Sequence, residues 1–399
     1  MQVPPFSLNE QLSQIGQDLD TAVAKTLRSG QYIGGQQVEL FEKSFSETIN
    51  VPYTVSCNSG TDALVLALRA LDIGPGDEVI SVSFSFFATA EAISNVGAKP
   101  IFIDVNSNDF LINPNLIEDA ITSSTKAILP VHLFGNPVNM DAIMSIAKKH
   151  GLKVIEDCAQ AAGSYWKGKS LGSIGDIGCF SFFPTKNLGA AGDGGAVTTK
   201  SLELARRMRD LSIHGMPKRY FHTELGYNSR LDALQAAVLN VKLPLLSSWV
   251  EQRRKIALNY IKNLQDLSGI ELPKDSSVNG TINSWNQFVI KVKNYDINKD
   301  SLREEFIAIP NQVRTYLPDS RCRDLLRQNL SDKGINTIIY YPIPIHLQPA
   351  YSQLKGKSHS LINSELLCSQ VLSLPIFPEL SIEKQDYVVQ SIKELINCQ

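Results

Sequence analysis

Between Tyr53 and Thr199, short β-rich runs alternate with helical stretches, and this alternation constrains the fold more than any other feature of the chain. Several of the runs are apolar on both faces, as strands buried in a mainly parallel sheet should be. The stretch from Asp62 to Leu71 is amphipathic, so as a helix it can cover such a sheet. The repeated order predicts an α/β layered domain. Its expected strands are residues 54–56, 78–82, 100–103, 127–131, 153–155, 179–182 and 195–198.

The rest of the chain predicts a second, smaller α+β unit. A helical segment from Leu231 to Leu243 is stopped or kinked at Pro244, because proline has no amide hydrogen to donate. The helix that follows, Ser247 to about Leu267, leads into the second unit. We expect residues 1–246 to form an N-terminal arm and a large domain, and residues 247–399 a small domain. The strands expected in the small domain are 287–292 and 335–340, and its last helix is 383–396.

Composition and charge exclude several classes of protein. The chain has 399 residues, of which 43% are hydrophobic and 20% charged, so it can bury a substantial core. Its net charge of -2 provides no positive field to hold nucleic acid or an anionic membrane. No apolar run approaches the ~18 residues of a membrane span, and the first residues lack the pattern of a signal peptide. The cysteines form no C-x-x-C pair, so we expect no metal site and a cytoplasmic protein.

Two residues at expected strand ends point to cofactor chemistry. Lys186 lies in a Gly-rich turn after the strand 179–182, and Asp157 follows the strand 153–155. The carboxyl ends of parallel strands are where α/β sheets build their sites. A lysine amine forms a Schiff base with pyridoxal phosphate, and a carboxylate keeps the pyridine nitrogen protonated. Taken singly, the lysine could be a surface charge and the aspartate a helix cap, but their order along the chain favours a pyridoxal phosphate enzyme.

A phosphate site is predicted between the strand 54–56 and the helix after it. Gly60 permits a close backbone approach, and Ser59 and Thr61 offer hydroxyls at the helix N-terminus, where unpaired amides favour an anion. The alternative for this string is a simple helix N-cap. Ser181, on the strand that leads to the lysine, is a second candidate phosphate donor.

Further side chains near these strand ends are candidates for the cofactor ring. Three phenylalanines follow the strand 78–82, and an aromatic there can stack on a flat ring, although core packing is the commoner role. Gln160 can hydrogen-bond the ring oxygen. Glu156 should point away from the side occupied by Asp157, because successive residues of a strand alternate.

Together these strings closely resemble the DegT/DnrJ/EryC1/StrS family of pyridoxal phosphate-dependent sugar aminotransferases. The match extends from Gly30 to Pro375, and its specific parts are the segments 58–64, 85–89, 155–160, 180–186, 226–232 and 341–346. The resemblance implies the fold-type I aminotransferase fold, which has a mixed, mainly parallel seven-stranded sheet in a large domain and a smaller C-terminal α+β domain. It also implies a homodimer with active sites at the subunit interface.

Position by position, the resemblance assigns cofactor contacts. It makes Lys186 the Schiff-base lysine, Asp157 the partner of the pyridine nitrogen and Phe86 the ring-stacking aromatic. It implies that Gln160 contacts the ring hydroxyl. It also implies that the phosphate is held by Ser59, Gly60, Thr61, Ser181 and, from the other subunit, Asn228.

The same resemblance implies that the sugar nucleotide is bound by Arg230, Tyr341 and His346. Taken singly, Asn228 and Arg230 could cap the helix that begins near Leu231. His346 could be a loop histidine whose hydrogen bonds are satisfied within the protein.

The resemblance implies transfer of an amino group from glutamate to a nucleotide-linked keto-sugar. The segments 214–222 and 228–232 look like members that act at C-3; members that act at C-4 tend to carry a bulkier residue at Ser229. The family also contains dehydratases in which histidine replaces the lysine, and a regulatory role was once attached to some relatives. Lys186 favours the aminotransferase over the dehydratase, and the absence of a basic face or a helix-turn-helix argues against the regulator. An insertion at roughly 294–319 departs from the family pattern, and both a lid and a surface elaboration stay open for it.

Overall fold

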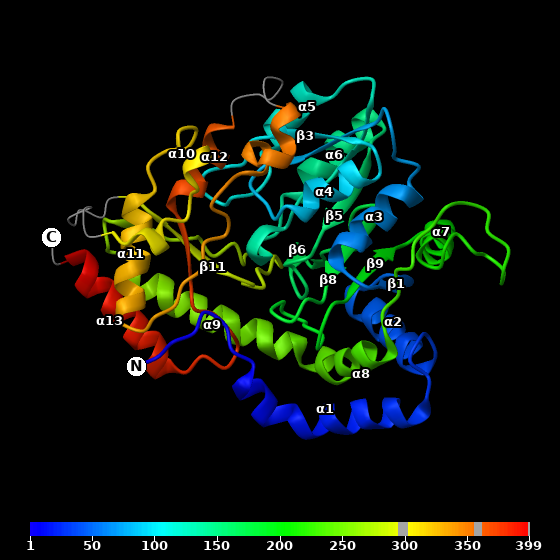
Figure 1. Cartoon of the computed structure of the whole chain (residues 1–399), viewed down its shortest axis with the longest axis horizontal. Helices are drawn as coiled ribbons and strands as arrows, with labels where there is room; N and C mark the ends of the chain where they lie inside the picture. The colour runs from blue at the N-terminus through cyan, green and yellow to red at the C-terminus, as the bar shows by residue number, and fades with distance from the viewer. Residues whose placement is uncertain (294–301, 355–360, 398–399) are drawn as a thin grey trace.

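The computed structural model describes residues 1–293, 302–354 and 361–397. Within them, the main sheet has seven strands in the order β1-β9-β8-β5-β4-β2-β3 (Figure 1). β9 runs antiparallel to β1 and β8, and the other neighbouring pairs are parallel, so the predicted α/β sheet is confirmed. The strands are β1 (Tyr53–Cys57), β2 (Glu78–Val82), β3 (Lys99–Ile103), β4 (Thr125–Ile128), β5 (Lys153–Asp157), β8 (Ile177–Ser181) and β9 (Gly195–Thr199).

Burial explains why these runs form strands of the sheet interior. In β2, Val79 and Ile80 are both fully buried although they point to opposite faces, and all of β9 is buried. Side chains on both faces therefore face protein, which is the pattern expected of a mainly parallel sheet covered by helices. A two-stranded hairpin, β6 (Tyr165–Trp166) with β7 (Lys169–Ser170), connects β5 to β8.

Helices pack on the sheet between its strands. Ser59 caps α3, since its hydroxyl accepts from the Asp62 amide, and the apolar side of α3 contacts β8 and β9. The helices of this part of the chain are α1 (Asn9–Ser29), α2 (Gln36–Ile49), α3 (Gly60–Ala70), α4 (Ala88–Asn95), α5 (Ile117–Ala120), α6 (Met140–His150), α7 (Leu202–Ser212) and α8 (Ala233–Lys242).

A long helical stretch leads from the large sheet into the second half of the chain (Figure 1). α8 is followed by a 3₁₀ turn, Leu243–Leu245, and then by α9 (Leu246–Leu264). Pro244 lies in that turn, as the predicted stop or kink requires. Among the described residues, Ala233–Leu264 is the one helix that meets the length and composition of a membrane span. More than half of its most apolar window is buried inside the protein, and α8 packs on α1 and α2 as a core helix does.

A second hydrophobic core lies around α9, a small sheet and two helices, α11 (Arg321–Asp332) and α13 (Ile382–Asn397). The sheet is antiparallel, with the order β10-β11-β12, and α11 and α13 pack beside it (Figure 1). The boundary after residue 246 stays a prediction. The remaining elements here are β10 (Ile270–Glu271), β11 (Phe288–Val292), α10 (Asn311–Arg314), α12 (Ile362–Gln370) and β12 (Val371–Leu374).

The predicted strand at residues 335–340 is wrong. Ile335 makes one isolated bridge to Val3, and Ile338 makes one to Ser373. The segment therefore touches the sheet without joining its ladder, because it changes partner within three residues, from Val3 to Ser373 of β12, and the chain then turns towards Tyr340 and the large domain. Of the insertion at 294–319, residues 294–301 lie outside the described part, and the rest holds a 3₁₀ turn (Glu304–Phe306) and α10.

Candidate active site

A cavity of about 420 Å³ lies at the carboxyl ends of β1, β2, β5 and β8. It is large enough for a small-molecule cofactor, since such sites range from roughly 300 to 1,000 Å³. Most of the residues predicted for the site line it, although they come from separate segments of the chain. They are Ser59, Gly60, Thr61, Phe86, Asp157, Gln160, Ser181, Lys186 and Tyr341.

One end of the cavity is a cradle of hydroxyls at the N-terminus of α3. A Cβ on Gly60 would lie 2.6 Å from the Cβ of Ser181, so glycine is needed for α3 to approach β8 this closely. Ser59 and Thr61 line the same end. The hydroxyl of Ser59 accepts from the helix at 3.1 Å but keeps its own hydrogen to donate. The N-cap and an anion site are therefore compatible, and a phosphate suits this cradle.

Asp157, another residue of the cavity lining, lies buried where β5 finishes. Burial raises the pKa of its carboxyl group, and hydrogen bonds from the Ala159 amide (3.1 Å) and the Thr89 hydroxyl (2.9 Å) offset that only in part. Ser85 pairs with Thr89 at 2.8 Å and continues the chain of hydroxyls. A protonated ring nitrogen beside Asp157 would supply the opposite charge that a buried carboxylate favours.

Lys186 is held in a tight turn after β8. Its amide donates to the Phe183 carbonyl at 2.8 Å, and a Cβ on Gly189 would lie only 2.4 Å from the Pro184 carbonyl oxygen. Burial lowers the pKa of the Lys186 amine to about 8, against the opposing charge of Asp157. A usable share of the amine is therefore neutral near pH 7, and only the neutral form can attack an aldehyde.

Gln160, Tyr341 and Phe86 also line the cavity. The Gln160 side-chain carbonyl accepts from the Phe134 amide at 2.6 Å, so its NH₂ group faces Tyr341 and donates to that hydroxyl at 2.9 Å. Burial raises the pKa of Tyr341, so the phenol stays neutral and can donate its own hydrogen. Phe86 is 58% exposed at the cavity wall, where a flat ring could lie against it.

Comparison with known proteins agrees with this geometry. The model of the DegT/DnrJ/EryC1/StrS aminotransferase family matches residues 13–318 and 309–393. The solved structure of DesV from S. venezuelae in complex with a ketimine intermediate is 39% identical, with a TM-score of 0.88 over 98% of each chain. The chain belongs to the DegT/DnrJ/EryC1/StrS aminotransferase family. It is a pyridoxal phosphate-dependent aminotransferase, and the hydroxyl cradle, the buried acid and the lysine suit that cofactor.

The aminotransferase has several curated relatives that it matches over nearly the whole length of both chains. It is 42% identical to the UDP-N-acetyl-3-dehydro-α-D-glucosamine 3-aminotransferase of Acidithiobacillus ferrooxidans over 99% of this chain and 98% of the relative. It is 39% identical to the dTDP-3-amino-3,4,6-trideoxy-α-D-glucose transaminase of Streptomyces venezuelae over 98% and 96%. It is also 41% identical to a protein of Geobacillus stearothermophilus named a pleiotropic regulatory protein, over 99% and 98%.

Three residues predicted for the aminotransferase site lie away from the described lining of the cavity. Arg230 donates to the Asn228 side chain at 2.5 Å, and both stand outside it. His346 is buried, with Nδ1 at 2.6 Å from the Ser83 hydroxyl and Nε2 at 3.2 Å from the Glu365 carboxylate. Within this chain, His346 thus has the contacts of a satisfied loop histidine, and its role towards substrate stays a prediction.

Sequence reasoning missed several residues that the fold brings to the aminotransferase site. Thr89, from the segment after β2, donates to Asp157 and pairs with Ser85, and Gln287 and Tyr340 line the cavity from the second half of the chain. The closeness of Thr89 to Phe86, whose carbonyl accepts from the Thr89 amide at 3.2 Å at the start of α4, was a usable signal. No comparable local signal marks Gln287.

Proposed function

We propose that this aminotransferase moves an amino group from glutamate to C-3 of a nucleotide-linked keto-sugar. The observation that carries the proposal is that Lys186, Asp157 and the cradle at the N-terminus of α3 line the same cavity. The position of transfer is supported by the relatives from A. ferrooxidans and S. venezuelae, whose names both place the amino group at carbon 3. Those names carry UDP and dTDP, respectively, so either nucleotide is a candidate carrier.

In this proposal, different residues of the cavity bind different parts of the cofactor. When bound, pyridoxal phosphate supplies an aldehyde for the amino group and a ring that withdraws electrons. Ser59, Thr61, Ser181 and the free amides of α3 hold the phosphate, and Gly60 leaves room for it. These contacts fix the group at one end, so the opposite end can be held at a defined distance from Asp157.

The remaining cavity residues orient the ring and move protons. Asp157 keeps the ring nitrogen protonated, Gln160 and Tyr341 donate to the ring oxygen, and Phe86 covers one face. The Lys186 amine, with a pKa of about 8, can take a proton from the substrate carbon and return it near neutral pH.

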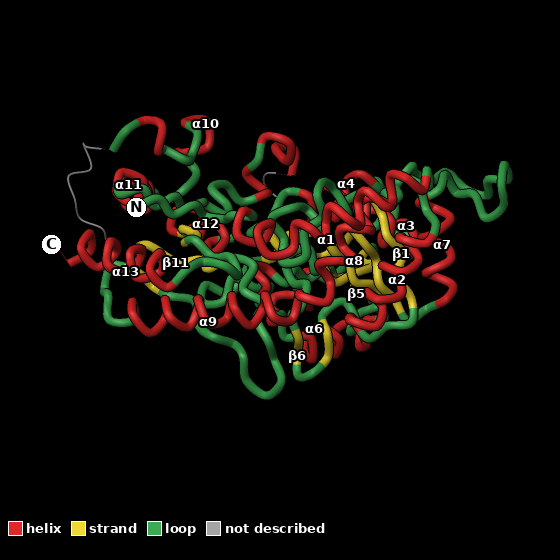
Figure 2. Tube along the Cα trace, turned by 90° about the horizontal axis from the view of Figure 1, so that it is seen from below, coloured by secondary structure: helices red, strands yellow, loops and turns green. Residues whose placement is uncertain are grey.

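A projecting arm supports a homodimer. The segment 214–227, which follows α7, extends away from the rest of the protein in two perpendicular views (Figure 1 and Figure 2). Tyr220, Phe221 and Leu225 are 80%, 59% and 86% exposed on it, which is unfavourable for an isolated chain in water. We therefore assign the arm to contact with a second copy. Asn228 and Arg230, at its base, would then reach the cofactor phosphate and the sugar nucleotide of the partner's site.

The cysteines agree with a cytoplasmic enzyme, which completes the proposal. Within the described residues all of them are free thiols: Cys57, Cys158, Cys179, Cys322 and Cys368. Free buried thiols suit a reducing compartment.

A product screen tests the proposed function. The pyridoxal phosphate-loaded protein is incubated with glutamate and with UDP-, dTDP- and GDP-linked 3-keto and 4-keto sugars, and products are identified by NMR. We expect a 3-amino sugar together with 2-oxoglutarate. Product from 4-keto sugars alone would overturn the assigned carbon. No amino transfer with any sugar would overturn the substrate class and favour the regulatory role named for the G. stearothermophilus relative.

A further inference from the structure

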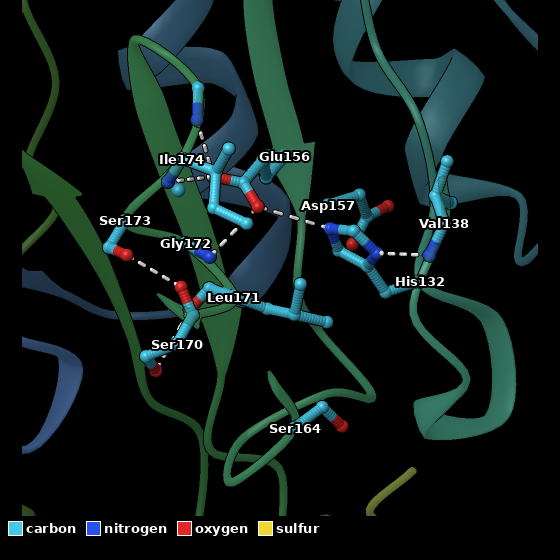
Figure 3. A network of polar contacts seen from close by, with 12 residues as sticks. His132, Val138, Glu156, Asp157, Ser164, Ser170, Leu171, Gly172, Ser173 and Ile174 are labelled. Carbon is cyan, nitrogen blue, oxygen red and sulfur yellow. Dashed lines mark hydrogen bonds and ion pairs between the residues drawn. The ribbon is translucent and has the colours of Figure 1, made fainter. Parts of the chain in front are cut away.

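Behind the cavity, on the other face of β5, Glu156 has a fully buried carboxylate. As predicted from strand alternation, it points away from the side occupied by Asp157. Figure 3 shows it between the loop that follows β7 and the His132 imidazole. Its donors are the amides of Gly172 (3.0 Å), Ile174 (2.8 Å) and Gly175 (2.7 Å) and the His132 Nε2 (3.2 Å). Burial opposes its ionisation, but these donors hold the pKa of Glu156 below its usual value.

The hydrogen bonds of His132 identify its tautomer. The Val138 amide donates to Nδ1 at 3.1 Å, so Nδ1 accepts and the proton of the neutral ring sits on Nε2, facing Glu156. His132, Glu156 and Cys158 are close enough to hold a metal ion. Both imidazole nitrogens and the carboxylate already have partners, however, and burial raises the pKa of the Cys158 thiol, so we assign a structural network instead.

This network is joined to Asp157 through the backbone. The Asp157 amide donates to the Pro130 carbonyl at 3.0 Å, and the His132 amide donates to the Asp157 carbonyl at 3.1 Å. The loop that contains His132 therefore hydrogen-bonds both the backbone amide and the backbone carbonyl of Asp157. The loop 172–175, anchored by Glu156, leads directly into β8, which pairs with the end of β5 and carries Ser181. One carboxylate thus ties together three segments that position the cavity residues.

We propose that Glu156 and His132 are positioning residues that hold the Asp157 carboxylate in place from the opposite face of the sheet. The inference rests on the proposed role of Asp157 towards the ring nitrogen. Glutamine at residue 156 has nearly the same shape, but its NH₂ group would meet amide hydrogens where the carboxylate accepts them. At least one segment must then shift, and a displacement of about 1 Å at a reacting group can cost on the order of 100-fold in rate.

A matched control exists at the far edge of the sheet. Asp104, which follows β3, is also buried, and it accepts from the amides of Val105 (2.9 Å), Asn363 (2.8 Å) and Ser364 (2.9 Å) and from the Ser364 hydroxyl (2.7 Å). β2 and β4 separate β3 from β5. Asp104→Asn therefore replaces a buried, amide-bound carboxylate by an amide, as Glu156→Gln does, but away from the cavity. Comparing the two separates loss of positioning from loss of stability.

The experiment measures thermal midpoints, the Kd of pyridoxal phosphate by absorbance titration of the cofactor-free protein, and kcat and KM for the sugar. We expect Glu156→Gln to raise that Kd about tenfold, the scale for residues that orient a ligand from behind. It should lower kcat on the order of 100-fold with KM nearly unchanged. Asp104→Asn should lose a similar amount of thermal stability and keep Kd and kcat close to wild type.

The outcomes separate this inference from the proposals it rests on. A folded Glu156→Gln variant whose Kd and kcat equal those of Asp104→Asn would overturn it. If Glu156→Gln fails to fold, His132→Leu removes one donor and leaves the three amides; an unchanged Kd and kcat there would overturn the inference as well. Unimpaired turnover in Asp157→Asn would refute the role of Asp157 itself, which is a different failure.

Discussion

Asp157 and Glu156 are consecutive residues of β5, both buried, yet they belong to opposite regions of the molecule. On the cavity side, burial raises the pKa of Asp157, and one amide and one hydroxyl offset it only in part. On the other side, four donors hold the pKa of Glu156 below its usual value. The charge of Lys186 also favours the ionised Asp157 but leaves its pKa raised, whereas the donors around Glu156 outweigh the effect of burial. That difference distinguishes a group prepared for a ligand from a group that supports the structure.

The largest expected effect is on turnover, and it comes from a substitution on the cavity side of β5. Lys186→Ala removes the amine that bonds the cofactor, so turnover should fall by at least about 10⁴-fold while the fold persists. Borohydride reduction followed by peptide mapping should tag Lys186 in wild type and nothing in the variant. Lys200→Ala, at an exposed lysine after β9, is the control. A tag at any other lysine would contradict the site assignment.

The comparison itself predicts stability changes of opposite sign in the cofactor-free protein. Glu156→Gln should lower the free energy of unfolding at pH 7 by about 3 kcal/mol, because buried amide donors lose the acceptor that the carboxylate provides. Asp157→Asn should raise that free energy, because it removes a carboxylate whose ionised form burial disfavours. Urea unfolding at neutral pH checks both variants. Changes of the same sign would refute the distinction between the two faces.

The pH dependence of stability should separate the two carboxylates further. The lowered pKa of Glu156 contributes stability above the unfolded value of roughly 4.3, and this is lost as the pH falls through the lower, folded value. The raised pKa of Asp157 acts in the opposite direction: its contribution grows as the pH falls through the folded value towards the unfolded ~3.9. Each dependence should disappear in the corresponding amide variant.

A smaller effect concerns the rate of cofactor uptake. Because burial lowers the pKa of Lys186 to about 8, the neutral amine should increase roughly tenfold per pH unit below that value and then level off. Stopped-flow absorbance of the cofactor-free protein mixed with pyridoxal phosphate between pH 6 and 10.5 measures the profile. A rate that keeps rising up to the ordinary lysine value near 10.4 would contradict the lowered pKa.

The smallest effect tests the donor that sequence reasoning missed. Thr89→Val removes the hydroxyl that donates to Asp157, so the pKa of Asp157 should rise further and kcat should fall about tenfold. The cost in stability should be about 1 kcal/mol. Thr26→Val, at a buried threonine of α1 whose hydroxyl bonds a helix carbonyl, controls for the loss of a hydroxyl. Equal kcat values in the two variants would remove Thr89 from the site.

Much of the site could be predicted because its signals are local. The seven strands of the main sheet were found from apolar runs, and each formed within a few residues of its expected bounds. Lys186, Asp157 and the string at Ser59 lie at strand ends or helix starts, which sequence periodicity locates well. Parallel strands finish at one edge of a sheet. Once the strands were known, these residues could therefore be expected to lie close together.

What depended on distant partners could not be predicted. The run 335–340 has strand-like composition, but within the described residues it bridges first to Val3 and then to Ser373, so it makes isolated bridges and no ladder. The hydrogen bond from Gln160 to Tyr341 joins residues 181 positions apart, and no local pattern predicted it; the role of Tyr341 towards the sugar stays a prediction. Such pairings depend on which segments meet in space, and that is not encoded in either segment alone.

The sequence by itself therefore determined the class of fold, the cofactor and the order of the lysine, acid and phosphate cradle, because strand period and strand ends are short-range properties. Strand alternation already predicted that Glu156 points away from Asp157, but only the tertiary structure decided which groups satisfy its buried carboxylate. That outcome depends on His132 and on the loop 172–175, which reach Glu156 across neighbouring strands and satisfy it before any ligand can.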